Sequence, residues 1–137
     1  MAFTGNFTCD VFKTGLLDGT VDFGSGTFKL ALYTNAATLN QNTTSYTTQG
    51  EVVAAGYTAG GEVVTPVVAS SGSVSFVDFG DVTWNGSFTA RGALLYKVGG
   101  GNPAICVLDF GSDKTSTTSF IVTFPAATSA SALIRLS

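Results

Sequence analysis

Three Asp-Phe-Gly tripeptides, each preceded by an aliphatic residue, are the part of the sequence most suggestive of catalysis. They lie within 21–24, 77–80 and 108–111. In protein kinases such an aspartate binds magnesium, together with a His-Arg-Asp loop and a lysine in a Val-Ala-Ile-Lys strand. This chain has neither companion motif and contains no histidine. We therefore interpret the three sites as strand ends, where an alternation of aliphatic, acidic and aromatic residues meets a turn at glycine.

The strand-end interpretation assigns a direction to each side chain of the repeated motif. The phenylalanines should point into a core and the aspartates toward solvent or a basic partner; these are Phe23, Phe79 and Phe110, and Asp22, Asp78 and Asp109. Arg91, at the start of an apolar strand, is the expected basic partner. Its candidates are Asp78, Asp81 and Asp109, and a contact with another subunit is the alternative.

The remaining chemistry-bearing residues do not form a recognisable catalytic or metal site. Without histidine, a Ser-His-Asp or Cys-His arrangement and the usual zinc sites are excluded. Two carboxylate pairs suit a glycosidase in principle, Asp78 with Asp81 and Glu51 with Glu62, but solvated acids at strand ends are the simpler interpretation. Asp78, Asp81 and Asn85 offer oxygen ligands for calcium, yet their spacing is not that of an EF-hand. We expect no catalytic site, no metal and no cofactor.

Composition predicts one domain with a surface that carries little charge. The 137 residues suffice for a single domain, 1–137, with a sizeable core. Charged residues make up 11% of the sequence, against ~25% in typical soluble domains, and threonine, serine and glycine take their place. A surface this poor in charge is weakly protected against association. It suits a permanently assembled protein, or one whose hydroxyl groups solvate it sufficiently.

Charge and hydropathy argue against two classes of partner. The net charge is −3 and the six basic residues are scattered, whereas nucleic-acid binding needs clustered lysine and arginine. A run of about 18 apolar residues, which a membrane span would need, does not occur. The first residues lack the features of a signal peptide, so we expect a protein that is not secreted and folds in a cytoplasm. Cys9 and Cys106 are then expected as buried thiols, a disulfide between them being the lesser alternative.

The apolar pattern predicts an all-β fold with one short N-terminal helix. The helix is expected near 9–17, with Thr8 as its cap and a stop at 18–19. The clearest strand is 27–34, where apolar residues alternate with others. Further short strands are expected at 51–57, 61–69, 73–79, 82–84, 90–98, 104–110, 120–124 and 132–136. Their number and spacing indicate a single-domain antiparallel β-sandwich, jelly-roll-like in type.

Two details of the strand pattern bear on how the sheets are arranged. Pro66 cannot donate to a ladder, so it is expected at an edge or at a break between sheets. The segment 104–110 is almost continuously apolar, which predicts cover on both of its faces. Between the strands, 35–48 is a long polar connection anchored by Leu39 and Tyr46, and loops of that length tend to be functional surfaces or covers.

Several segments carry a resemblance to a known group of proteins. They are Thr-Phe-Lys-Leu-Ala-Leu-Tyr-Thr at 27–34, the Thr-rich loop reaching Tyr46, Gly-Glu-Val at 50–52, Gly-Tyr-Thr-Ala-Gly-Gly at 56–61 and Ala-Arg-Gly-Ala-Leu-Leu-Tyr at 90–96. Together they resemble small virion structural proteins of tailed bacteriophages. The segments 56–61 and 90–96 are the more specific parts, and the resemblance extends from the helix near Phe12 to Phe124.

The resemblance implies a capsid cement or decoration protein. Such a protein is an all-β module of the virion that works as an oligomer and clamps neighbouring subunits of the major capsid protein. The expected contact regions are the helix, the loop 35–48 and the glycine-rich loop 99–102. The contact residues predicted within them and on the strand at 90–98 are Phe12, Leu39, Thr43, Tyr46, Arg91 and Gly100. Deletion of 35–48 is expected to leave the domain folded and to abolish capsid binding.

Two other functions remain open at this point. One is a tail, neck or fibre component of the same virion. The other is a carbohydrate-binding β-sandwich that uses Trp84, Tyr57 or Tyr96 as a stacking surface, and a fully buried Trp84 would count heavily against it. An enzyme based on carboxylate chemistry ranks below both.

Overall fold

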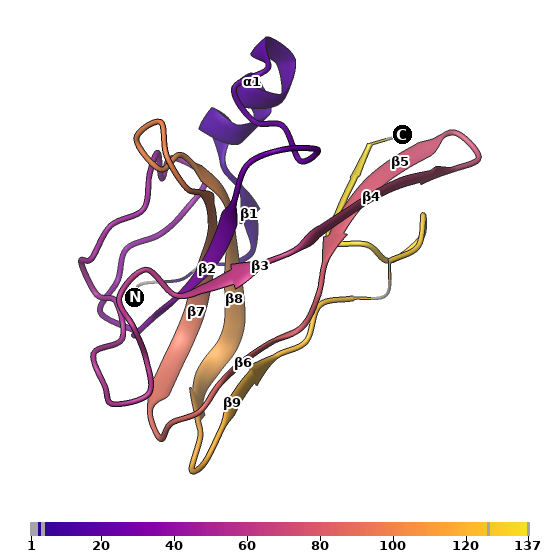
Figure 1. Cartoon of the computed structure of the whole chain (residues 1–137). Coiled ribbons are helices and arrows are strands. Elements are labelled where there is room, and N and C mark those ends of the chain that lie inside the picture. Colours follow the sequence, from indigo (N-terminus) through magenta and orange to yellow (C-terminus); the bar gives the residue numbers. More distant parts are fainter. Residues whose placement is uncertain (1–2, 4, 126, 137) are drawn as a thin grey trace.

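The structure, a computed structural model, describes residues 3, 5–125 and 127–136. In these residues the chain forms short β-strands and a single helix, and every strand pair is antiparallel. The predicted all-β fold with one short N-terminal helix is confirmed. The strands are divided among three sheets (Figure 1).

The largest sheet has five strands in the order β1–β8–β7–β2–β3. Their bounds are β1 Phe7–Thr8, β8 Ala104–Thr115, β7 Thr89–Lys97, β2 Phe28–Tyr33 and β3 Glu62–Val64. Burial runs along most of β2 and β7, so both faces of the sheet are covered there. In β8 the first residues, Ala104 to Val107, are buried, while the second half is progressively exposed. The predicted cover on both faces therefore holds for the first half of this strand.

The helix α1 spans Asp10–Asp18, one residue later than predicted. Its N-cap is Cys9 rather than Thr8, and no side-chain hydrogen bond caps this end. Gly19 ends the helix with φ of 83°, the left-handed conformation that glycine adopts without steric cost. The helix packs against the main sheet through Phe12, which is buried, and leaves Leu17 almost fully exposed.

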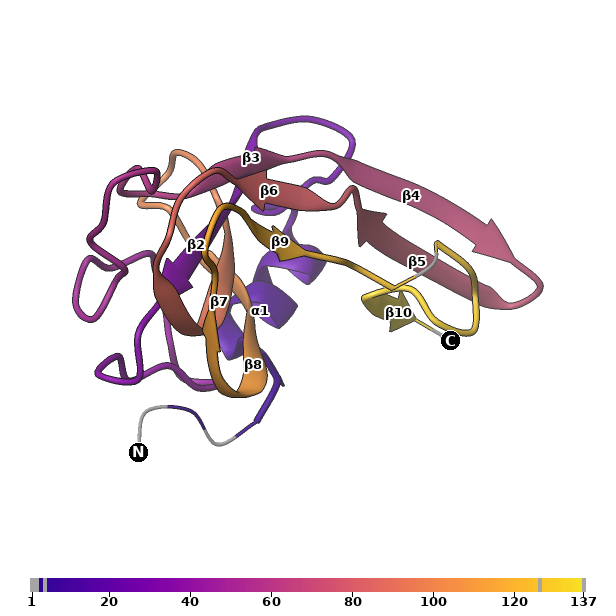
Figure 2. The same ribbon diagram turned by 90° about the horizontal axis from the view of Figure 1, so that it is seen from below.

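A second sheet projects from the main one and is called the arm below. It has the order β10–β5–β4, with β4 Pro66–Ser71, β5 Val74–Phe79 and β10 Ile134–Leu136. Figure 1 and Figure 2 show the β4–β5 hairpin extending away from the main sheet. Pro66 lies where the chain leaves β3 and enters β4, which confirms its predicted place at a break between sheets.

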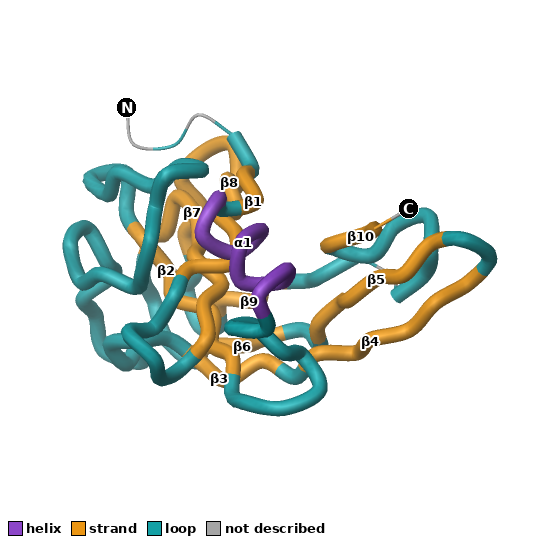
Figure 3. Tube along the Cα trace, turned by 90° about the horizontal axis from the view of Figure 1, so that it is seen from above, coloured by secondary structure: helices purple, strands orange, loops and turns teal. Residues whose placement is uncertain are grey.

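A two-stranded ribbon and a long connection complete the body. The ribbon pairs β6 Val82–Trp84 with β9 Phe120–Val122. The connection runs from 34 to 61 between β2 and β3, and it contains isolated bridges rather than a further strand (Figure 3). The prediction of a strand at 51–57 is therefore wrong. Gly56 and its neighbours turn there instead of extending.

The three Asp-Phe-Gly sites differ from one another in the structure. Only the second ends a strand, since β5 stops at Phe79. The first lies in a turn that Asp22 closes by accepting the Gly24 N–H at 2.8 Å, and the third lies inside β8. The three phenylalanines do point inward as predicted: Phe79 is buried, and Phe23 and Phe110 pack partly buried against the core.

Candidate functional site

The densest group of polar side chains surrounds Glu51, which is buried in the connection between β2 and β3. Its Oε1 accepts a hydrogen bond from the Tyr46 hydroxyl at 2.6 Å. Its Oε2 accepts one from the Tyr57 hydroxyl and one from the Gly60 N–H at 2.8 Å. The carboxylate thus accepts three hydrogen bonds, all from residues of the same connection. It fastens this part of the connection to itself.

The other two tyrosines of the chain extend this network. The Tyr96 hydroxyl donates to the Gly60 carbonyl at 2.7 Å, and its ring stacks on Tyr46 with centroids 4.8 Å apart. The Tyr33 hydroxyl donates to the Thr47 carbonyl at 2.6 Å. The tyrosines of β2 and β7 therefore fasten the connection to the main sheet. We call this group, Glu51 with Tyr33, Tyr46, Tyr57 and Tyr96, the tyrosine cluster.

Burial and the nearby carboxylate of Glu51 keep the four tyrosines of the cluster in their neutral phenol form. Desolvation raises the pKa of Tyr57, and the hydrogen bond to Glu51 raises it further. The pKa of Tyr46 is raised by the same two causes, while the pKa values of Tyr33 and Tyr96 are raised by desolvation and then by the charge of Glu51. These groups therefore act as hydrogen-bond donors, which is a structural role.

The carboxylate pairs considered for a glycosidase do not form a site. Glu51 is committed to the tyrosine cluster, whereas Glu62 is exposed on β3. Asp78 is buried and accepts the Leu133 N–H at 3.3 Å, so the expectation that it faces solvent or a basic partner is wrong. Asp81 accepts the Phe124 N–H at 2.9 Å. Asp78 and Asp81 thus hold the C-terminal part of the chain against β5 and the segment that follows it, and Glu51 holds the connection between β2 and β3.

Arg91 pairs with Asp109, one of its three predicted partners. Its Nη2 lies 3.0 Å and its Nε 3.2 Å from Oδ1 of Asp109, and both side chains are about nine-tenths buried. The guanidinium also lies over the Phe3 ring, 5.9 Å from its centroid. The prediction of an internal ion pair is therefore confirmed. The positive charge of Arg91 is therefore balanced by Asp109 of the same protomer.

Sulfur and oxygen ligands do not gather into a metal site. Within residues 3, 5–125 and 127–136, no group of three or more His, Cys, Asp or Glu side chains is close enough to hold a metal ion. Cys9 and Cys106 are buried free thiols, as expected from the sequence. Burial raises the pKa of Cys9 to about 11 and also raises the pKa of Cys106, so neither thiol is activated.

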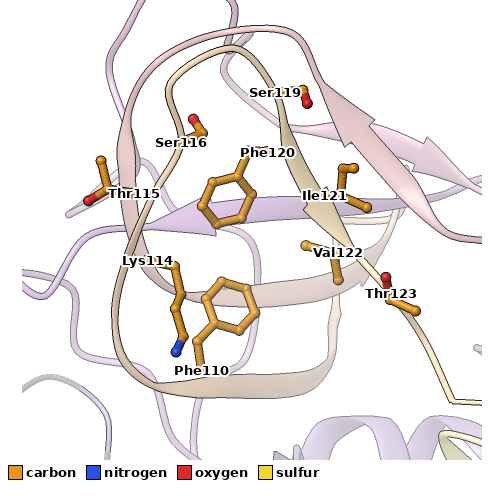
Figure 4. A pocket seen from close by; sticks show the side chains of 9 residues that line it. All are labelled: Phe110, Lys114, Thr115, Ser116, Ser119, Phe120, Ile121, Val122 and Thr123. Carbon is orange, nitrogen blue, oxygen red and sulfur yellow. The ribbon is translucent and has the colours of Figure 1, made fainter.

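A hollow of about 430 Å³ lies between the second half of β8 and the strand β9 (Figure 4). The side chains that surround it are Phe110, Lys114, Thr115, Ser116, Ser119, Phe120, Ile121, Val122 and Thr123. Lys114 is the single charged side chain in this set. The Ser116 hydroxyl is already used, since it donates to the Gly86 carbonyl at 2.7 Å and accepts the Phe88 N–H at 3.2 Å. Apart from Lys114, the side chains around the hollow are apolar or carry hydroxyl groups, and none of them is an acid.

Exposed apolar side chains gather on the arm. All residues of β4 after Pro66 are exposed, including Val67 and Val68, which are 49% and 60% exposed. Because adjacent residues of a strand point to opposite faces, apolar surface is uncovered on both sides of the arm. Leu136 on β10 is exposed as well.

An apolar groove of about 170 Å³ separates the arm from the helix. Its lining is Phe12, Leu16, Phe23, Val68, Ser75, Phe76, Val77, Ile134 and Leu136. Ser75 is the one polar side chain in this lining. The groove therefore joins the exposed surface of β4 to the body of the protein.

The predicted contact residues fall into two groups. The side chains of Phe12 and Leu39 are buried in the core, and Arg91 is held by Asp109, which leaves little of them for a partner to touch. Thr43 is half-buried and Gly100 exposed. Tyr46 is half-buried in the tyrosine cluster, and its N–H donates to the Asn102 carbonyl at 3.0 Å. The loops 35–48 and 99–102 thus lie side by side, and their contact with a partner stays a prediction.

The loop 35–48 is more firmly built into the fold than the sequence indicated. Leu39 is fully buried, the Ala104 N–H donates to the Thr44 carbonyl at 3.0 Å, and Ser45 forms a bridge with Pro103. A deletion of 35–48 would remove these contacts together with Tyr46. The expectation that this deletion leaves the domain folded is therefore replaced by an expectation of severe destabilisation.

The aromatic residues considered for sugar stacking are inside the protein. Trp84 is 1% exposed, Tyr57 8% and Tyr96 4%. Trp84 packs between Tyr57 and Phe120, with ring centroids 6.2 Å and 6.4 Å away. Its indole N–H has no hydrogen-bond partner among the described residues. These rings fill the core and present no face to a sugar.

Sequence reasoning missed the two features that stand out in the structure. The tyrosine cluster joins residues far apart in the chain, and nothing in the sequence around Glu51 indicates their meeting. The arm had a visible signal, since no charged residue occurs between Glu62 and Asp78. That signal could have identified the arm as a surface suited to association.

Comparisons with known proteins found no match, so the proposed function has to be argued from the residues and their geometry. No protein family matches the sequence, and neither a curated protein nor a solved structure provides a match. In the part of the chain that the structure describes, the helix is too short to cross a membrane, and no candidate span occurs.

Proposed function

We propose that this protein is a non-enzymatic structural component of a tailed-bacteriophage virion, namely a decoration protein that bridges subunits of the major capsid protein on the head. The observation that carries the proposal is the arm, where Val67 and Val68 are exposed on opposite faces of a projecting sheet. Burying the exposed half of each valine in an assembly is worth about 1 kcal/mol. Contacts of that size become strong when they repeat over a symmetric shell.

The placement of the charged side chains outside the arm agrees with a structural role. The buried acids Glu51 and Asp78 accept internal hydrogen bonds, and Arg91 is neutralised inside the protomer by Asp109. The hollow between β8 and β9 has a single charged side chain, Lys114, and no acid to act with it. Together with the sequence resemblance, these features favour a protein whose work is binding and support. The partner we propose is the major capsid protein, and we propose homo-oligomers as the working form.

Carbohydrate binding would need an exposed aromatic ring for stacking, and the candidate rings of Trp84, Tyr57 and Tyr96 are buried. A tail, neck or fibre component remains the competing location, and a binding experiment separates it from decoration. The double variant Val67→Ser/Val68→Ser removes the apolar surface of the arm without adding charge. We expect it to lower the occupancy of purified heads at least tenfold.

The matched control is Val53→Ser, which changes a valine that is 96% exposed outside the arm. Bound protein on heads is counted by cryo-electron microscopy and sedimentation. Decoration predicts regular density over the lattice for the unaltered chain and for the control. Density confined to one vertex or to the tail would contradict the proposal.

A further inference from the structure

The strand β4 is a free edge of the arm. It is the last strand in the order β10–β5–β4, so one side of its backbone has no partner in this sheet. Exposed edges of this kind are templates for pairing with another strand, and proteins usually block them with charges, prolines or bulges. The pairing of β4 with β5 is regular over its whole length, with no bulge.

The direction of the backbone groups along this edge follows from one hydrogen bond. The Gly80 N–H donates to the Thr65 carbonyl at 3.3 Å, which makes Thr65 a residue that faces β5. In an antiparallel ladder every second residue faces the same neighbour, so Val67, Ala69 and Ser71 also face β5. Pro66, Val68 and Ser70 therefore direct their backbone groups to the free edge. Pro66 supplies only a carbonyl there, while Val68 and Ser70 each supply both a donor and an acceptor.

The side chains around this edge carry no charge. From Val63 to Val77 the sequence has neither an acidic nor a basic residue. Pro66 is the one protective feature, and it lies at the base of the arm. The outer part of β4, around Ala69, is left without the features that normally prevent pairing.

We propose that β4 pairs with β4 of a second copy of this chain, in an antiparallel arrangement whose two-fold axis passes beside Ala69. In this register the Val68 N–H and carbonyl meet the carbonyl and N–H of the partner's Ser70, and symmetry repeats the exchange. The axis brings Ala69 next to the partner's Ala69 in a non-hydrogen-bonded pair, the closely spaced kind that small side chains fit. The two arms then form one continuous sheet.

A second copy fits this edge better than an unrelated partner because the edge is complementary to itself. The donors and acceptors of Val68 and Ser70 alternate symmetrically about Ala69. A two-fold axis normally opposes like charges, and none are present in this stretch. The arm also extends away from the main sheet, which separates the two bodies when the tips meet (Figure 2). The inference does not depend on the proposed capsid role, since it concerns the purified chain alone.

Cysteine cross-linking tests the register directly. In Ala69→Cys the new thiols face each other across the axis, where non-hydrogen-bonded pairs have Cα atoms about 4.5 Å apart. The matched control Val67→Cys lies on the same strand and the same face. Its thiols would be offset by four residues, about 13 Å, from one another. The native cysteines do not interfere, because both are buried.

We expect mild oxidation to convert most of the Ala69→Cys protein into a covalent dimer and to leave the Val67→Cys protein uncross-linked. Sedimentation equilibrium of the unaltered chain should give twice the 14.0 kDa monomer mass. In Val68→Pro one edge N–H is lost while the bonds to β5 are kept, and the dimer should weaken at least tenfold. If that variant fails to fold, as judged by circular dichroism, the cysteine pair decides alone.

Three results would overturn the inference. One is a chain that stays monomeric at about 100 µM. Another is equal cross-linking, or none, in the two cysteine variants. The third is cross-linking of Ala69→Cys to a different protein in preference to itself. Failure of the unaltered chain to bind heads, while it still forms the dimer, would instead count against the capsid role alone.

Discussion

A carboxylate buried without a cation has to be stabilised by hydrogen-bond donors, and Glu51 has three of them. Two come from Tyr46 and Tyr57 and the third from the Gly60 backbone. The cluster thereby holds the connection 34–61 against β2 and β7 at the cost of one buried charge. At the residue scale, this is where the fold depends most on a single side chain.

The variant Glu51→Gln should destabilise the protein by about 2 kcal/mol, because the amide nitrogen cannot accept the hydrogen bonds that one carboxylate oxygen accepts. Urea unfolding at pH 7 measures the effect. The control is Glu62→Gln, an exposed acid on β3 that should change stability by less than about 0.5 kcal/mol. Equal effects of the two substitutions would show that the tyrosine cluster contributes little.

Stability should also fall at alkaline pH. Burial raises the pKa of Cys9 from 9.0 to about 11, and it raises the pKa values of Cys106 and of the four tyrosines. A raised pKa in the folded state means that the unfolded chain loses these protons first. The contribution is fully present below about pH 9 and is lost progressively as the pH rises.

The free energy of unfolding measured between pH 7 and pH 11 checks this dependence. Tyrosinate absorbance should appear together with the loss of structure and not before it. A free energy of unfolding that stays constant over this range would contradict the assigned burial of these groups.

At the scale of elements, Gly61 shows how closely the connection approaches the main sheet. Its φ is +82°, and a Cβ at this position would overlap the Leu30 carbonyl oxygen. Gly72, in the β4–β5 turn, has φ of +64° but open space around it. The two glycines therefore separate the cost of backbone strain from the cost of a steric clash.

We expect Gly72→Ala to cost about 1 kcal/mol from the left-handed conformation alone. Gly61→Ala should cost at least twice as much, because the β2–β3 pairing has to move as well. Thermal and urea unfolding of both variants measure the difference. Equal losses would mean that the approach of the connection to β2 is not tight.

The elements that local pattern defines were predictable, and those that depend on distant contacts were not. The helix near 9–17, the strand at 27–34 and the break at Pro66 follow from periodicity and from backbone chemistry. The strand expected at 51–57 failed because Val52 and Tyr57 are buried by a looped connection rather than by a ladder. The Asp-Phe-Gly repeat misled in two of three sites, because a short motif does not specify whether its glycine ends a strand.

For the candidate site, the prediction succeeded where one side chain had few plausible partners. Arg91 was assigned three acids and pairs with Asp109. Phe12 and Leu39 were predicted at a partner surface but are buried, because an apolar residue in a polar segment indicates a core anchor equally well. The uncharged stretch between Glu62 and Asp78 was a signal for the arm, but the exposure of β4 on both faces is a feature of the fold and does not follow from that stretch alone.

At the scale of the whole molecule, the chain consists of a well-packed body and a projecting arm. The body is secured by the buried core of the main sheet, the tyrosine cluster and the Arg91–Asp109 pair. The arm presents uncharged, partly apolar surface to its surroundings. In the proposed assembly, this sheet of three short strands would gain stability by burying its exposed surface.

The proposed role is tested most directly by counting copies of this protein in purified virions. Quantitative mass spectrometry gives the ratio of this chain to the major capsid protein. A decoration protein predicts hundreds of copies in a fixed ratio to the capsid subunit. A handful of copies would indicate a tail, neck or vertex component, and absence from the particle would contradict a structural role in the virion altogether.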